Sequence, residues 1–107
     1  MAKKKLSGRA QRRQDERAAE KLADARERLA LLEAGGVAAR PLQVTSASQV
    51  EPHALALPCL RCDGAQRLDE HAAVTVNGER LRVARTTCAR CGTPRETWYR
   101  IAPDLPS

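Results

Sequence analysis

Four cysteines at two equal spacings are the residues of this sequence with the clearest chemistry. Cys59 and Cys62 form one CxxC pair, and Cys88 and Cys91 form a second pair after 25 intervening residues. A CxxC turn directs two sulfur atoms toward one ion, and two such turns complete a tetrahedral four-cysteine site, the usual form of structural zinc. The spacing therefore predicts that the four cysteines bind one structural Zn²⁺ ion.

Other uses of four cysteines agree less well with the sequence. A thioredoxin-like dithiol requires a βαβ pattern, which is absent, and disulfides require an oxidising compartment. Four thiolates can also hold an iron–sulfur cluster, and this alternative stays open. His53 lies near the first pair, but we expect a structural or solvent-exposed role for it because four cysteines already complete a site. Closed coordination leaves no position for a substrate, so the metal is expected not to be catalytic.

The residues between the two pairs must bring the pairs together, and their pattern predicts a β-hairpin. Asn77-Gly78 is the strongest short-range signal for a hairpin with a two-residue turn. Such a turn fixes the register and places four apolar residues on one face, namely Ala72, Val74, Leu81 and Val83. Another strand is expected over 96–101, with Trp98 and Tyr99 on opposite sides.

Two residue types near the cysteines suit the predicted turns. Gly64 and Gly92 follow the two pairs, at positions where a Cβ atom would be in the way. Arg61 and Arg90 lie inside the pairs. We expect these two cations to offset the negative charge of four thiolates around one Zn²⁺ ion.

The chain before the cysteines is basic and then helical in composition. Six basic residues and no acidic residue occur within the first thirteen positions, namely Lys3, Lys4, Lys5, Arg9, Arg12 and Arg13. Residues 1–13 are therefore predicted to form a disordered basic arm. Ala, Leu, Glu, Arg and Gln dominate the next segment and predict an amphipathic helix over 14–35, which ends at Gly35-Gly36. Opposite charges at i,i+4 spacing, such as Asp24 and Arg28, are expected to support it.

One edge of the predicted helix is apolar but narrow, with Leu22, Leu29 and Leu32 as its large members. Two hypotheses follow: the edge rests on the rest of the chain, or it docks on a partner. Residues 36–56 are predicted to form a linker, within which 42–45 could make a short edge strand, and residues 103–107 form a tail.

The composition limits both the core and the class of function. The chain has 107 residues, a formal net charge of +6, no Phe and nineteen Ala. Leu, Val and Ile together also number nineteen, which is too few to bury a full-length core or to wall a substrate pocket. A folded part of about 45 residues needs a metal to supplement its core. Because the sequence also has no acid/base or nucleophile constellation, we expect no enzyme and no small-molecule substrate.

The sequence also predicts where the protein acts. There is no apolar run of about 18 residues, so no membrane span is expected. The lysines at the N-terminus are not followed by an apolar stretch, which argues against a secretory signal. The expected compartment is the cytoplasm, where thiols stay reduced or bind metal.

Residues 57–102 resemble the zinc-ribbon family, in which two CxxC turns stand on a small antiparallel sheet of about three strands. The resemblance implies that the four cysteines ligate the metal. Leu60 stands where ribbons often have Pro, and Gly64 comes one residue later than usual. The expected fold is thus a small metal-stabilised α+β protein, with a C-terminal zinc ribbon preceded by a single α-helix and a basic arm. Ribbons of transcript-cleavage factors carry an acidic pair at the hairpin tip, which Asn77-Gly78-Glu79 does not match.

Two functions agree with these features. In the first, the protein binds nucleic acid, or a ribonucleoprotein or transcription complex, and the basic arm neutralises phosphates. Arg80 and Arg82 of the hairpin would extend that contact. In the alternative, the protein is an adaptor or dimerising module that uses the Leu22/Leu29/Leu32 edge and binds no nucleic acid.

Overall fold

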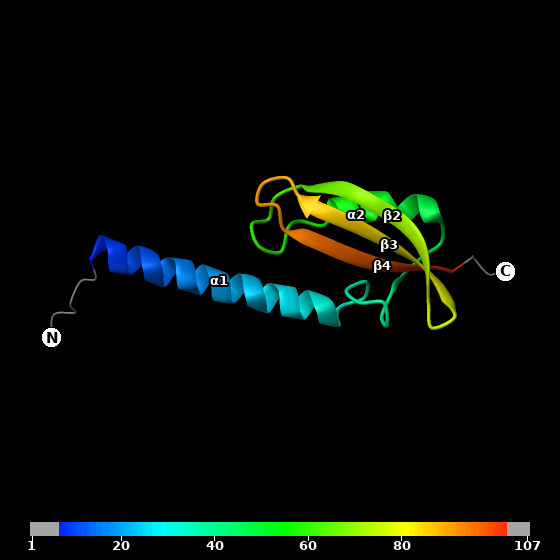
Figure 1. Ribbon diagram of the computed structural model, residues 1–107, viewed down its shortest axis with the longest axis horizontal. Coiled ribbons are helices and arrows are strands. Elements are labelled where there is room, and N and C mark those ends of the chain that lie inside the picture. Colours follow the sequence, from blue (N-terminus) through cyan, green and yellow to red (C-terminus); the bar gives the residue numbers. More distant parts are fainter. Residues whose placement is uncertain (1–6, 103–107) are drawn as a thin grey trace.

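The computed structural model describes residues 7–102 as one long helix beside a four-stranded sheet (Figure 1). The elements in chain order are α1 (Gly8–Leu32), β1 (Leu42–Val44), the 3₁₀ helix η1 (Ala47–Gln49), α2 (Val50–Ala56), β2 (Gln66–Val76), β3 (Glu79–Cys88) and β4 (Pro94–Ile101). The predicted small α+β class is confirmed. No helix within residues 7–102 is both long and apolar enough to cross a membrane.

Three antiparallel strands form the body of the sheet, as predicted. The strand order is β1-β4-β3-β2, in which β1 adds to the edge of β4 in parallel. The β2–β3 hairpin has the expected register, with Val74 opposite Leu81. Its turn residues Asn77 and Gly78 have φ values of 52° and 79°, which a type I′ turn requires. In the predicted apolar patch, Leu81 and Val83 are buried.

The opposite face of the sheet is covered by α2, which the sequence analysis assigned to a linker. Val50 and Ala54 of α2 pack with Ala84 and Tyr99 of the sheet, and all four residues are buried. Residues 36–56 are therefore not a plain linker, and α1 is not the single helix. A seven-residue helix with two apolar positions gives almost no periodic signal, because such a helix forms only when tertiary packing stabilises it.

The long helix begins earlier than predicted. The Ser7 side chain accepts a hydrogen bond of 3.2 Å from the backbone N–H of Ala10 and so caps the first turn. Arg9, Arg12 and Arg13 consequently lie in α1, and the prediction of a disordered arm was wrong for them. The remaining bases of the predicted arm, Lys3, Lys4 and Lys5, lie outside the described residues, as does the predicted tail over 103–107.

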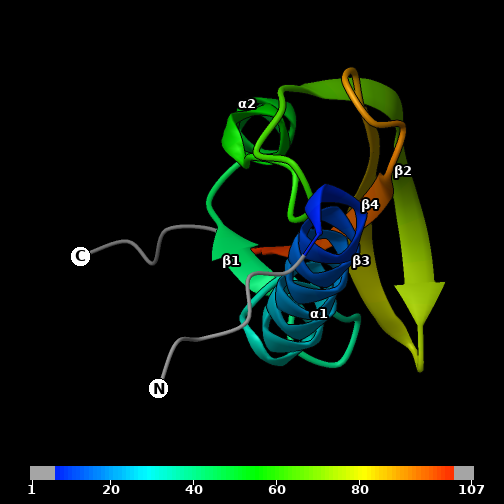
Figure 2. The same cartoon turned by 90° about the vertical axis from the view of Figure 1, so that its left-hand side faces the viewer.

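The side of α1 that meets the rest of the chain is not its Leu edge. Leu22, Leu29 and Leu32 are 60%, 59% and 61% exposed, so the hypothesis that this edge rests on the chain was wrong. Of the α1 residues, all of which the structure describes, Ala23 alone is buried. Figure 2, which looks nearly along α1, shows the helix beside the sheet.

We expect the folded protein to lose stability between about pH 10 and 12 because of Tyr99. Burial raises the pKa of Tyr99 to about 12, whereas the tyrosine of an unfolded chain titrates near 10. The fold favours the neutral phenol, so this contribution is complete below about pH 10 and is lost as the pH rises through 12. Thermal unfolding of wild type and Tyr99→Phe at increasing pH measures the effect. The dependence should be weaker in Tyr99→Phe, and identical slopes would contradict the expectation.

Candidate metal centre

The sheet brings all four cysteine sulfurs into one cluster. The Sγ atoms of Cys59, Cys62, Cys88 and Cys91 all lie within 4.8 Å of one another, and the four cysteines are free. The Sγ atoms of Cys59 and Cys91 are 3.6 Å apart, and those of Cys62 and Cys88 are 3.4 Å apart. Tetrahedral zinc with bonds of about 2.3 Å holds its sulfurs about 3.8 Å apart. The cysteines are therefore positioned to bind one metal ion, as predicted.

The two CxxC loops, residues 59–64 and 88–93, have the same backbone hydrogen bonds. In the first loop the N–H of Cys59 donates to the carbonyl of Gly64 at 3.0 Å, and that of Asp63 donates to Cys59 at 2.9 Å. In the second loop Cys88 donates to Thr93 and Gly92 donates to Cys88, both at 3.0 Å. These equivalent turns direct both pairs of thiols to one point.

The equivalence explains why Gly64 comes late in the first loop. The fifth residue of each loop has positive φ, and it is Asp63 at 59° in the first and Gly92 at 77° in the second. Asp tolerates this conformation better than most residues. Gly64 is needed for a different reason, since a Cβ atom there would lie 2.9 Å from the Sγ of Cys88. The prediction that a Cβ atom would be in the way is confirmed for Gly64 and wrong for Gly92, where a Cβ atom would meet no described atom within 4 Å and the positive φ is what favours glycine.

Hydrogen bonds within the loops prepare some of the thiols for a cation. The Thr93 hydroxyl, 3.0 Å from the Sγ of Cys91, lowers the pKa of Cys91 to about 6, and the Thr93 backbone N–H adds to this effect. The backbone N–H of Cys91 likewise lowers the pKa of Cys88. The hydrogen bond to Cys88 raises the pKa of Cys62 to about 12. These hydrogen bonds thus favour the thiolate form of Cys91 and Cys88 and the protonated form of Cys62.

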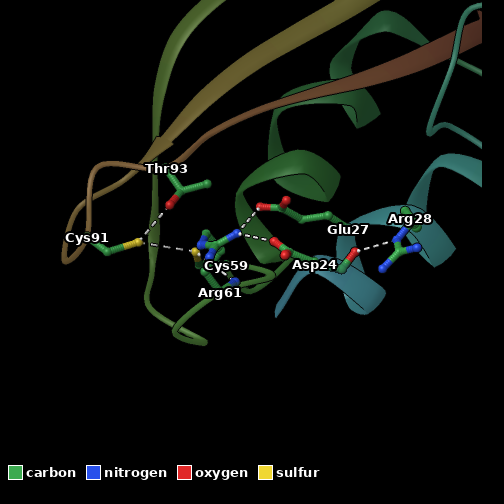
Figure 3. Close-up of polar contacts among 7 residues, drawn as sticks. All are labelled: Asp24, Glu27, Arg28, Cys59, Arg61, Cys91 and Thr93. Carbon is green, nitrogen blue, oxygen red and sulfur yellow. Dashed lines mark hydrogen bonds and ion pairs between the residues drawn. The ribbon is translucent and has the colours of Figure 1, made fainter. Parts of the chain in front are cut away.

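Arg61 does not turn toward the sulfurs but toward α1. Its Nη1 atom donates to Oδ1 of Asp24 at 3.3 Å and to Oε1 of Glu27 at 3.2 Å (Figure 3). The hydrogen bond to Glu27 is the main cause that raises the pKa of Arg61, and the hydrogen bond to Asp24 adds to it. The predicted Asp24–Arg28 pair takes another form, in which Arg28 donates to the backbone carbonyl of Asp24 at 3.5 Å.

A third ion pair joins α1 to the first CxxC loop. Arg26 of α1 donates to Asp63 of the first loop at 2.6 Å. Sequence reasoning missed these contacts because Arg61 and Asp63 lie 34 to 37 residues from their partners. No local pattern signals a pairing over such a separation.

His53 is placed as expected, outside the sulfur cluster. Its Nδ1 atom lies 2.7 Å from the hydroxyl of Tyr99, and the two rings meet edge to face with centroids 5.4 Å apart. His53 thus supports the core aromatic of the sheet domain and is not among the clustered ligands.

The predicted nucleic-acid residues are divided between two ends of the molecule. Arg9, Arg12 and Arg13 are exposed on the part of α1 that extends beyond the CxxC loops (Figure 1). Arg80 and Arg82 lie near the hairpin turn, at the end of the β2–β3 ladder away from Cys88. The structure therefore does not bring the hairpin arginines to the arginines of the helix.

The fold and the site define a small α+β protein with four cysteines arranged to bind one metal ion. Comparison with known proteins adds no family, because no family model matches the chain and no curated protein or solved structure matches it. Its function must be inferred from its own residues.

Proposed function

We propose that this protein is a non-enzymatic zinc-ribbon protein that binds nucleic acid or a ribonucleoprotein through its N-terminal basic segment. The observation that carries the proposal is the exposure of Arg9, Arg12 and Arg13 on a helix that projects beyond the metal site (Figure 1). In this arrangement the metal stabilises the sheet domain, and α1 presents positive charge.

Two features favour zinc and the ribbon family for the metal-binding part. Four thiol ligands at tetrahedral spacing are typical of structural zinc. The two equivalent CxxC loops stand at one end of the antiparallel strands β2, β3 and β4, as in a ribbon. When bound, zinc would hold the two loops together and so contribute to folding. The α2 helix and the β1 strand are additions to that plan.

The charge pattern of α1 favours contacts to the phosphate backbone. Arg9, Arg13 and Arg17 are spaced by four residues and share one side of the helix. At 1.5 Å per residue they span about 12 Å, enough to contact several phosphates. The two aromatic rings that could stack on bases are poorly available, since Tyr99 is fully buried and Trp98 is half-buried. We therefore expect binding with little sequence preference.

The affinity for nucleic acid should fall steeply with salt, because phosphate contacts release counterions. The test measures binding of a mixed-sequence RNA and a DNA duplex over a range of salt concentrations. Replacing Arg9, Arg12 and Arg13 together by Gln should lower the slope of log affinity against log salt by about 2 to 3. Deleting residues 1–13 should remove most binding. A matched control replaces Arg80 and Arg82 by Gln. These two arginines lie near the hairpin turn, away from the basic end of α1, so their loss should change the slope little. Wild type that binds neither probe at low salt would overturn the proposal.

The alternative is a protein-interaction module, favoured by the exposed Leu22/Leu29/Leu32 edge. Lys21 and Arg28 each precede a Leu of this edge and are exposed. In an antiparallel pair of two copies these bases would face each other, so the edge fits an acidic amphipathic helix of another protein better than a second copy. The salt series separates the two functions: Leu29→Glu should bind nucleic acid as wild type does, and failure of every variant to bind favours the alternative.

A further inference from the structure

The long helix is attached to the sheet domain at two places. At its C-terminal end, Gly35 accepts a hydrogen bond of 2.8 Å from the N–H of Trp98, and Arg40 donates to the carbonyl of Leu32 at 2.9 Å. The second attachment is a set of three ion pairs with the first CxxC loop, which we call the loop–helix ion pairs: Arg61–Asp24, Arg61–Glu27 and Arg26–Asp63.

Between the two attachments the helix and the sheet are separated by a groove. The groove has a volume of about 760 Å³ and is lined by Leu31 on the α1 side and by Trp98 and Thr97 on β4. Ala23 is the one buried residue along α1, which the structure describes in full. Apolar packing therefore holds α1 only weakly, and its direction depends on the loop–helix ion pairs.

The ion pairs are built on the backbone of a metal-binding loop. Arg61 lies between Cys59 and Cys62, and Asp63 directly follows Cys62. The backbone of Asp63 has a φ of 59° and donates to the carbonyl of Cys59 at 2.9 Å. An ion bound by both cysteines would hold the loop in the shape that presents Arg61 and Asp63 to α1.

We propose that the metal centre sets the direction of α1: the ion-bound first loop holds the helix through the loop–helix ion pairs, and without these pairs the helix turns about Gly35-Gly36 while the sheet stays folded. The proposal rests on the metal binding of the proposed function but not on nucleic-acid binding. Each exposed ion pair contributes little alone. A change in the shape of the loop would remove all three together.

A rotation of α1 about its C-terminal attachment moves the basic N-terminal end of the helix the furthest. The helix runs for 25 residues from Gly8 to Leu32, which corresponds to about 37 Å of helix. A modest rotation about Gly35 therefore displaces Arg9, Arg12 and Arg13 by a large distance relative to the sheet. The metal would in this way determine where the positive charge of α1 lies.

Residual dipolar couplings of backbone amides test the proposal, because they show whether α1 and the sheet share one alignment tensor. In the zinc-loaded wild type, α1 and β2–β4 should fit a single tensor. Zinc-loaded Arg61→Gln should require two tensors, while its zinc content stays at one equivalent. A matched control is Arg28→Gln, which changes an exposed arginine of the same helix that donates only to the backbone of α1. It should behave as wild type. About 1 M salt, which reduces the Debye length to about 3 Å, should mimic Arg61→Gln.

The outcomes separate this proposal from the proposed function. A single tensor in zinc-loaded Arg61→Gln, or two tensors in both Arg61→Gln and Arg28→Gln, would overturn the control of α1 by these ion pairs. Metal content measured on the same samples tests whether the protein binds a metal ion at all. Purified wild type with less than about half an equivalent of metal would overturn the proposed metal function, and with it the dependence of α1 on the ion.

Discussion

Cys88→Ser is expected to unfold the sheet domain and to leave α1 largely helical. Cys88 is 2% exposed at the end of β3, and its sulfur belongs to the four-cysteine cluster. Structural zinc contributes about 10–16 kcal/mol at neutral pH, and whole domains are stable by only about 5–15 kcal/mol. Losing one ligand should therefore remove enough binding energy to unfold β2, β3 and β4. The helix α1 keeps its helical residues because few of its side chains depend on the sheet.

Circular dichroism and amide NMR spectra distinguish the two parts. Signals of β3 and β4 should collapse to unfolded positions, while much of the helical signal persists. The matched control Ala89→Ser introduces the same residue at the exposed neighbouring position of the same loop and should stay folded. Chelation of the metal from wild type should reproduce Cys88→Ser. A Cys88→Ser protein with native strand signals would show that the sheet is stable without the four-cysteine site.

Gly64→Ala is expected to weaken metal binding by about 10- to 100-fold, the range seen when groups that support a metal site are altered. The new Cβ atom would lie 2.9 Å from the Sγ of Cys88 and 3.1 Å from that of Cys62. Because both sulfurs must converge on the ion, the added methyl group forces at least one of them away. The loop backbone cannot easily shift instead, since the carbonyl of Gly64 accepts a hydrogen bond from the N–H of Cys59.

Competition with a chromophoric zinc chelator measures this loss directly. Gly8→Ala is the matched control, because a Cβ atom there would meet no described atom within 4 Å, and it should bind metal as wild type does. If Gly64→Ala bound zinc as tightly as Gly8→Ala, the space around the sulfurs would not limit the site.

Two features that differ from the sequence prediction, the early start of α1 and the helix α2, are each preceded by a local capping signal in the sequence. Ser7 precedes a run of good helix formers, and this is the usual signature of a helix start. The basic residues that follow favoured a disordered arm instead, although arginine is itself a good helix former. The capping box of Ser46 and Gln49 similarly marks the turn that leads into α2. Its signal was hidden because α2 is only seven residues long.

The sequence alone determined the features that depend on neighbours in the chain. The two CxxC spacings define the four ligands, and Asn77-Gly78 sets the hairpin register that carries Cys88 toward Cys62. Only the tertiary structure decided which side of α1 meets the sheet domain. That choice depends on Arg61 and Asp63, charges that the folded loop presents to a helix more than thirty residues away. Periodicity shows that an edge is apolar, but the position of these charges in space leaves Leu22, Leu29 and Leu32 in solvent.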